Sequence, residues 1–134
     1  MPVRLNPYLS FRDQAREAMT FYRDVFGGEL SIMTFADMHA SDDPTEADKV
    51  MHGQLEADHG LVLMGADTPK DMDLPESSSI SISLSGDDHA TLSGWYERLA
   101  EGGTVLEPLV QAPWGDHFGM LVDRFGTHWL VNIA

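Results

Sequence analysis

The segment FYRDVFGGEL, residues 21–30, recurs in the second half of the chain as WYERLAEGGTV, residues 95–105. Each copy ends an amphipathic helical pattern on a pair of glycines and continues into a strand-like run, with one extra residue before the glycines in the second copy. Because glycine ends helices readily, both copies predict a helix, a glycine stop and a following strand. The same junction occurring twice indicates an internal repeat.

The flanking residues extend this repeat in both directions. In the first half, the pattern predicts a helix over 13–28 with Asp13 as its N-cap, and its apolar positions Ala15, Ala18, Met19, Tyr22, Val25 and Phe26 follow helical spacing. Strands are predicted over 3–11, 29–35, 49–58 and 60–67. In the second half, strands are predicted over 79–85, 104–110, 116–123 and 127–134, around a helix over 87–103 that carries Leu92, Tyr96, Leu99 and Ala100 inward. Both halves therefore predict the order β-α-β-β-β.

The predicted strand 79–85 alternates without a break between serine and aliphatic residues. A strand sends successive side chains to opposite faces, so the serines share one face, and Ile80, Ile82 and Leu84 share the other. We expect the aliphatic face to pack beneath the helix and the serine face to look into a binding cleft.

Composition limits the classes of function. The chain has 134 residues and a formal net charge of −14, which disfavours binding to nucleic acid and to anionic membranes. It has no cysteine, which excludes disulfides and thiolate metal sites. It also shows no membrane-length apolar run and no secretory signal, so we expect a cytoplasmic protein. We expect one domain over 1–134, made of module one (3–67), an acidic linker (68–78) and module two (79–134). Two acidic segments, 36–48 and 67–76, are interpreted as solvated loops that aid solubility.

The pieces NPYLSF, FYRDVFGGEL, LVLMGAD and PWGDHFGMLVDRFGTHWLVN, within residues 6–132, resemble the PhnB-like branch of the vicinal oxygen chelate superfamily, which includes glyoxalase I, bleomycin-resistance proteins and extradiol dioxygenases. The resemblance implies an α+β fold in which paired β-α-β-β-β modules form a curved mixed sheet around a shared cleft. It also implies a homodimer, with domain swapping left open. Such relatives are often labelled ubiquinone-pathway methyltransferases, but this chain has no glycine-rich nucleotide loop after a strand, which disfavours that activity.

The resemblance also implies where a divalent metal would be held. The superfamily takes about one His, Glu or Gln ligand from each of four strands, and these positions fall here at Asn6, Leu63, Ser81 and Leu130. Leucine cannot donate to a metal, and serine or amide oxygens donate weakly. We therefore expect no metal and no cofactor, and a cleft that binds a small organic ligand.

Strand parity extends the predicted cleft wall, because residues two apart share a face. If Leu130 faces the cleft, His128 and Asn132 face it too, and if Leu63 faces it, so do Leu61 and Gly65. Trp114 lies in a loop of the kind that commonly caps a site. The predicted ligand-binding residues are Asn6, Tyr8, Leu63, Ser81, Ser83, Trp114, His128, Leu130 and Asn132.

Histidines keep other functions open. His128 is the candidate catalytic acid or base. A relocated metal site using His52, His117 or His128 stays an alternative, and His52 shares one strand face with Gln54 and Glu56. The main hypothesis is a metal-free binding protein. The alternatives are a metal-dependent or His-based lyase, isomerase or dioxygenase-like enzyme, and a ligand-free structural dimer. The sequence names neither the ligand nor the pathway, nor whether any reaction is catalysed.

Overall fold

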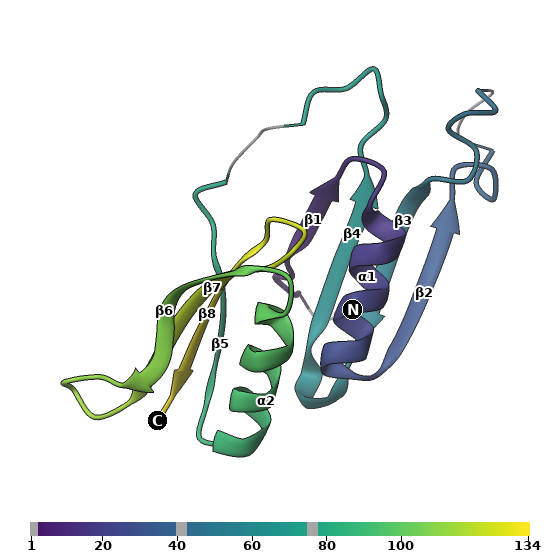
Figure 1. The fold of residues 1–134 in the computed structure, drawn as a ribbon. Coiled ribbons are helices and arrows are strands. Elements are labelled where there is room, and N and C mark those ends of the chain that lie inside the picture. Colours follow the sequence, from purple (N-terminus) through teal and green to yellow (C-terminus); the bar gives the residue numbers. More distant parts are fainter. Residues whose placement is uncertain (1–2, 40–42, 75–77) are drawn as a thin grey trace. The chain divides into compact units, whose positions relative to one another are not determined.

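The predicted repeat is present in the computed structural model, which describes residues 3–39, 43–74 and 78–134 (Figure 1). The chain divides into two compact units between residues 76 and 77. Unit 1 contains β1 (Tyr8–Phe11), α1 (Ala15–Phe26), β2 (Glu29–Thr34), β3 (Val50–Glu56), the short 3₁₀ turn η1 (Asp58–Gly60) and β4 (Val62–Asp67). Unit 2 contains β5 (Ile82–Gly86), α2 (His89–Ala100), β6 (Thr104–Gln111), β7 (His117–Val122) and β8 (His128–Ile133).

Each unit forms one mixed four-stranded sheet with the same connectivity. The strand order is β1-β4-β3-β2 in unit 1 and β5-β8-β7-β6 in unit 2. The first strand of each unit pairs in parallel with the last, and the remaining neighbours are antiparallel. The predicted α+β class with two β-α-β-β-β repeats is confirmed.

The helix of unit 1 covers one face of its sheet. All six apolar positions predicted to face inward on α1 are buried. The sheet beneath has no side chains at Gly53 and Gly65. Cβ atoms added there would lie 3.4 Å and 3.1 Å from the side chain of Met19. These glycines let the helix lie close to β3 and β4, as Figure 1 shows.

The helix of unit 2 covers its sheet in the same way. Leu92, Tyr96 and Leu99 are buried as predicted, whereas Ala100 is partly exposed. The sheet contributes Leu121, Trp129, Val131 and Ile133, each with 2% or less of its surface exposed. Gly119 lies under the ring of Tyr96, and a Cβ atom on Gly119 would lie 2.8 Å from Cε2 of that ring. The Tyr96 hydroxyl donates a hydrogen bond to the backbone oxygen of Glu107 at 2.7 Å.

Two predicted strands begin later than expected. The strand predicted over 3–11 begins at Tyr8, whose pairing with Met64 is the first of its ladder with β4. Val3 and Leu5 precede this ladder and are almost fully exposed. The strand predicted over 79–85 begins at Ile82, which pairs with Trp129 near the start of β8. Ile80 precedes this ladder and is 71% exposed, so the expectation that it packs beneath the helix is wrong. Leu84 is buried as expected, and Ser83 and Ser85 lie on the opposite face.

The N-terminus of α1 is bound by Asp67 rather than by Asp13. Asp67 is buried at the end of β4, and its two carboxylate oxygens accept hydrogen bonds from the backbone N–H groups of Ala15 and Val50, both at 2.9 Å. Asp13 adopts a positive φ of 65° and forms a 2.7 Å ion pair with Lys49. The predicted N-cap is therefore wrong, because a carboxylate distant in sequence takes its place.

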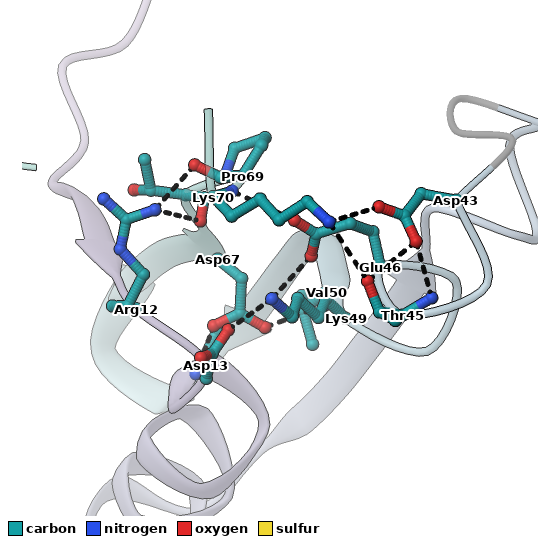
Figure 2. A network of polar contacts seen from close by, with 12 residues as sticks. Arg12, Asp13, Asp43, Thr45, Glu46, Lys49, Val50, Asp67, Pro69 and Lys70 are labelled. Atoms are coloured by element: carbon teal, nitrogen blue, oxygen red, sulfur yellow. Dashed lines mark hydrogen bonds and ion pairs between the residues drawn. The ribbon is translucent and has the colours of Figure 1, made fainter. Parts of the chain in front are cut away.

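Figure 2 shows that the acidic loops of unit 1 are tied together by cations. Glu46 is buried, pairs with Lys49 at 2.5 Å and accepts from the backbone N–H of Lys70 at 3.0 Å. Lys70 pairs in turn with Asp43 at 2.5 Å. Arg12 donates to the backbone oxygens of Thr68, Pro69 and Met72.

Glu46 departs from the interpretation of these segments as solvated loops, whereas Asp37, Asp48, Asp71 and Asp73 are exposed as expected. Ordinary surface ion pairs contribute little, but here several charges share partners across segments distant in sequence. The predicted acidic linker, 68–78, begins within the network, and its residues 75–77 lie outside the described residues, as does Asp42 of the first acidic segment.

Candidate functional site

The face of the unit 2 sheet opposite α2 gathers four of the predicted ligand-binding residues. Leu130 lies between Ser83 on β5 and Met120 on β7, and Asn132 lies between Ser85 and Phe118. His128 lies opposite Val122. Their alternates on β8 are the buried Trp129, Val131 and Ile133, so parity correctly separated the two faces of this strand.

The chemistry of this face is apolar at its centre and polar at its margins. Met120, Leu130, Phe118 and Val122 are partly exposed, and so are His128 and Asn132. The Asn132 amide donates to a carboxylate oxygen of Asp116 at 3.0 Å, which orients the amide. An apolar centre with a few oriented donors and acceptors is the usual composition of a small-molecule site.

Trp114 extends the same face from the loop between β6 and β7. Its ring meets that of Phe118 edge to face, with centroids 6.0 Å apart, and 65% of its surface is exposed. A tryptophan held by one aromatic contact and otherwise exposed is not a core anchor. This placement agrees with the predicted ligand-wall role.

Ser81 and Asn6, the two weak donors of the predicted set, both lie outside the strands. Ser81 is exposed and precedes β5. Asn6 is partly buried and precedes β1. Each lies in the unit expected from the repeat, but neither has a ladder partner that would fix its side chain on the open face.

Leu63 lies on the opposite face from the one predicted. It is 7% exposed and pairs with Leu55, which is 1% exposed, on the face that α1 covers. Gly65 lies on this face too, against Met19. The expectation that Leu63, with Leu61 and Gly65, lines an open face is therefore wrong. The open face of β4 presents Met64 instead, because neighbouring residues of a strand alternate.

The open face of the unit 1 sheet carries Tyr8 and a polar row on β3. The Tyr8 hydroxyl lies 3.1 Å from Nδ1 of His52. Nε2 of His52 lies 3.4 Å from Oε1 of Gln54, and the Gln54 amide donates to Glu56 at 2.9 Å. Burial raises the pKa of the Tyr8 phenol above its ordinary value, so this hydroxyl stays protonated near neutral pH.

The residues predicted at the superfamily's metal positions do not fit a metal. Leu63 and Leu130 offer no donor atom, and Leu63 faces the helix. His117 and His128 do not approach one another, because His117 pairs with Ile133 on the covered face and contacts His89, whereas His128 pairs with Val122 on the open face. Within residues 3–39, 43–74 and 78–134, no three His, Asp or Glu side chains gather as a metal site.

Reasoning from sequence missed the residues that complete both open faces. The predicted ligand-binding residues do not include Phe118 and Met120, although their alternation with Gly119 and Leu121 is visible in the sequence. The contact between Tyr8 and His52 joins residues 44 positions apart, and only the register of the sheet brings them together.

Asp123, within the motif DRFGTHW, has a structural role. It is 3% exposed, and its carboxylate accepts from the backbone N–H groups of Phe125 and Thr127 and from the indole of Trp129. Asp123 is therefore explained by the turn between β7 and β8.

Known proteins with similar sequences and structures agree with this architecture. The profile of the Glyoxalase/Bleomycin resistance protein/Dioxygenase superfamily matches residues 4–131. Protein YjdN of Escherichia coli (strain K12) is 26% identical over 140 residues, covering 97% of this chain and 95% of YjdN. Protein PA1353 from Pseudomonas aeruginosa has a solved structure that is 36% identical, with a TM-score of 0.86 and 98% of both chains covered. A PhnB protein from Bacillus cereus shares the fold, with a TM-score of 0.76 at 23% identity over 98% of this chain and 100% of that one.

Proposed function

The chain belongs to the glyoxalase/bleomycin resistance/dioxygenase superfamily, and from this premise we propose that it binds a small organic ligand without a metal. The observation that carries the proposal is the open face of the unit 2 sheet, where Leu130 and Met120 are flanked by Ser83, His128 and Asn132. A ligand with an apolar or aromatic body and one or two polar groups suits this face. The methyltransferase label of PhnB-like relatives is not extended to this chain.

The chemistry of the donor positions supports the absence of a metal from the proposed site. A ligand set with two leucines leaves at most two weak oxygen donors, which is too few for the four-coordinate or octahedral sites of divalent transition metals. The ligand would then be held by stacking on Trp114 and by hydrogen bonds from serine, amide and imidazole groups rather than by chelation.

The first experiment measures the metal content of protein purified without added metal. We expect much less than one equivalent of nickel, zinc, iron or manganese per chain. One equivalent that survives dialysis would overturn the metal-free proposal and favour the metal-dependent enzyme.

The second experiment screens small aromatic and carboxylic compounds by thermal shift, because a ligand that binds the native state raises its melting temperature. We expect hits whose shift is lost in Trp114→Ala and Ser83→Leu. Met72→Ala is the matched control, since Met72 is similarly exposed at 59% but belongs to unit 1. Hits that are unaffected by Trp114→Ala would place the site elsewhere, and a screen without hits would favour the ligand-free structural protein.

A homodimer is the second part of the proposal. It is supported by superfamily membership and by apolar side chains exposed on β6, namely Val105, Leu106 and Val110. Isolated apolar side chains are common on surfaces, but three on one edge strand are a feature that association would cover. Light scattering after size exclusion would give twice the mass of 14.8 kDa if the proposal holds, and the single-chain mass if it does not.

A further inference from the structure

A chain of four polar side chains crosses the open face of the unit 1 sheet. It runs from Tyr8 on β1 to His52, Gln54 and Glu56 on β3, and its contacts are 3.1 Å, 3.4 Å and 2.9 Å long. The rings of Tyr8 and His52 have their centroids 5.7 Å apart and are tilted by 36°. This row of side chains passes over β4, whose Met64 pairs with both Tyr8 and Gln54.

The donors and acceptors of this chain can be ordered from its Glu56 end. An ionised carboxylate only accepts, so Gln54 must turn its NH₂ group toward Glu56 and its oxygen toward His52. The reverse amide orientation would place two acceptors against each other. Nε2 of His52 then carries the proton that the amide oxygen accepts, which leaves Nδ1 with a free lone pair. The Tyr8 hydroxyl, 3.1 Å from Nδ1, therefore donates its proton to His52.

This order gives the phenol a base. We propose that Tyr8 and His52 form a proton-transfer pair that acts on a ligand presenting an acidic hydroxyl group to the Tyr8 oxygen. The ligand O–H bond breaks as its proton goes to the Tyr8 oxygen, and the phenolic O–H bond breaks as that proton goes to Nδ1 of His52. The ligand becomes an anion and His52 an imidazolium, which donates through Gln54 toward the Glu56 carboxylate. The inference adds a site and a reaction to the proposed binding function, and it does not depend on the unit 2 face.

Exposure of the partners suits this role. Tyr8 is 49% exposed, so a ligand can reach its oxygen, whereas His52 and Gln54 are partly buried. Cross-strand and same-face polar contacts do contribute to sheet stability, so the test must separate proton transfer from a merely structural contact.

The test uses acetylation of Tyr8 by N-acetylimidazole as a probe of the base. In this reaction the Tyr8 oxygen forms a bond to the acetyl carbon, the bond from that carbon to the imidazole nitrogen breaks, and the phenolic proton goes to His52 and then to the leaving imidazole. The chain has three tyrosines, and Tyr22 and Tyr96 are 0% and 7% exposed. Peptide mass spectrometry therefore follows Tyr8 directly, with the two buried tyrosines as internal references.

We expect His52→Gln to slow acetylation of Tyr8 about 10-fold or more. This is less than the roughly 100-fold that a positioned base supplies at the low end, because the site is open to solvent. Gln54→Ala should slow it less, and His89→Gln, at an exposed position in unit 2, should leave the rate unchanged. A purely structural contact predicts the opposite, because removing His52 would free the hydroxyl and speed acetylation. An equal or faster rate in His52→Gln overturns the proposal.

A second measurement uses the unmodified protein, so it remains informative even if the His52→Gln variant does not fold. Two-bond ¹H–¹⁵N correlation spectra of the unmodified protein distinguish the two neutral tautomers of each imidazole. We expect His52 to carry its proton on Nε2 and to show an acceptor-shifted Nδ1. A proton on Nδ1 would overturn the proposal, whatever the fate of ligand binding at the unit 2 face.

Discussion

Gly28 and Gly103 occupy the same position in the two units and press on the backbone of the same strand in each. A Cβ atom on Gly28 would overlap the carbonyl oxygen of Glu56 and lie 2.6 Å from the Cα of Ala57. On Gly103 it would overlap the carbonyl oxygen of Val122 and lie 2.9 Å from the Cα of Asp123. Each is the second glycine of its pair, so the repeated Gly-Gly is needed at the connection between the helix and the next strand.

Substituting either glycine by alanine should destabilise its unit. Because the overlap is with backbone, which cannot rotate away, we expect Gly28→Ala and Gly103→Ala each to lower the free energy of unfolding by about 1–3 kcal/mol. Gly28 should be the costlier, since its φ of +95° also disfavours a side chain. Chemical denaturation measures both.

Gly94 provides the matched control for these substitutions. It lies within α2, and a Cβ there would meet nothing within 4 Å. Alanine should therefore stabilise the protein by about 0.5–1 kcal/mol, as it does in open helix interiors. Equal losses at all three glycines would contradict the steric explanation.

Replacing Asp123 should loosen the turn between β7 and β8. Its buried carboxylate accepts three hydrogen bonds, two from backbone N–H groups and one from the Trp129 indole. Asp123→Ala leaves these donors without their acceptor, so we expect a loss of about 2–4 kcal/mol in the free energy of unfolding. Trp129→Phe should lose the indole contact alone, and Asp87→Ala, at an exposed position, should be nearly neutral. A neutral Asp123→Ala would show that the hydrogen bonds are replaced by water.

A glutamate placed at position 63 should not restore a metal site. Leu63 is buried beneath α1, so Leu63→Glu would bury a carboxylate without a partner and cost about 3 kcal/mol or more. Met64→Glu, one residue along but on the open face, should cost less than about 1 kcal/mol. Thermal unfolding with and without added Ni²⁺ tests the pair. A stable Leu63→Glu protein with a nickel-dependent rise in melting temperature would contradict the assignment of faces.

Acid should weaken unit 1 through its acidic network. Hydrogen bonds from Lys70 and Thr45 lower the pKa of Asp43, and contacts with Lys49 and the backbone N–H of Lys70 lower the pKa of Glu46. Carboxyl groups with a lowered pKa in the folded state contribute stability that is present above their ordinary pKa, near 4, and is lost as the pH falls through the lowered value. The free energy of unfolding should therefore fall below about pH 4.5.

The variants Glu46→Gln and Asp43→Asn should show a shallower fall with acid, because they remove the titrating groups. Urea titrations at several pH values between about 6 and 3 would measure it. A slope identical to that of the unmodified chain would assign the acid sensitivity to other carboxylates.

Local patterns in the sequence predicted much of the fold. The two helices and the order of the strands follow from apolar spacing. The Gly-Gly stops follow from positions where a Cβ atom would overlap backbone, as at Gly28 and Gly103. Alternation separated His128 and Asn132 from Trp129 and Val131 on β8. It failed at Leu63, because β4 carries apolar residues on both faces and its absolute orientation was taken from the resemblance.

The sequence by itself determined the repeat and the class of fold, because these depend on residue identity and short-range periodicity. Tertiary structure alone decided which end of a strand finds a partner, as at Tyr8 and Ile82. It alone placed Asp67 on the first turn of α1 and Tyr8 against His52. Such contacts join residues tens of positions apart, and their geometry is set by the register of the sheet, which no local pattern encodes.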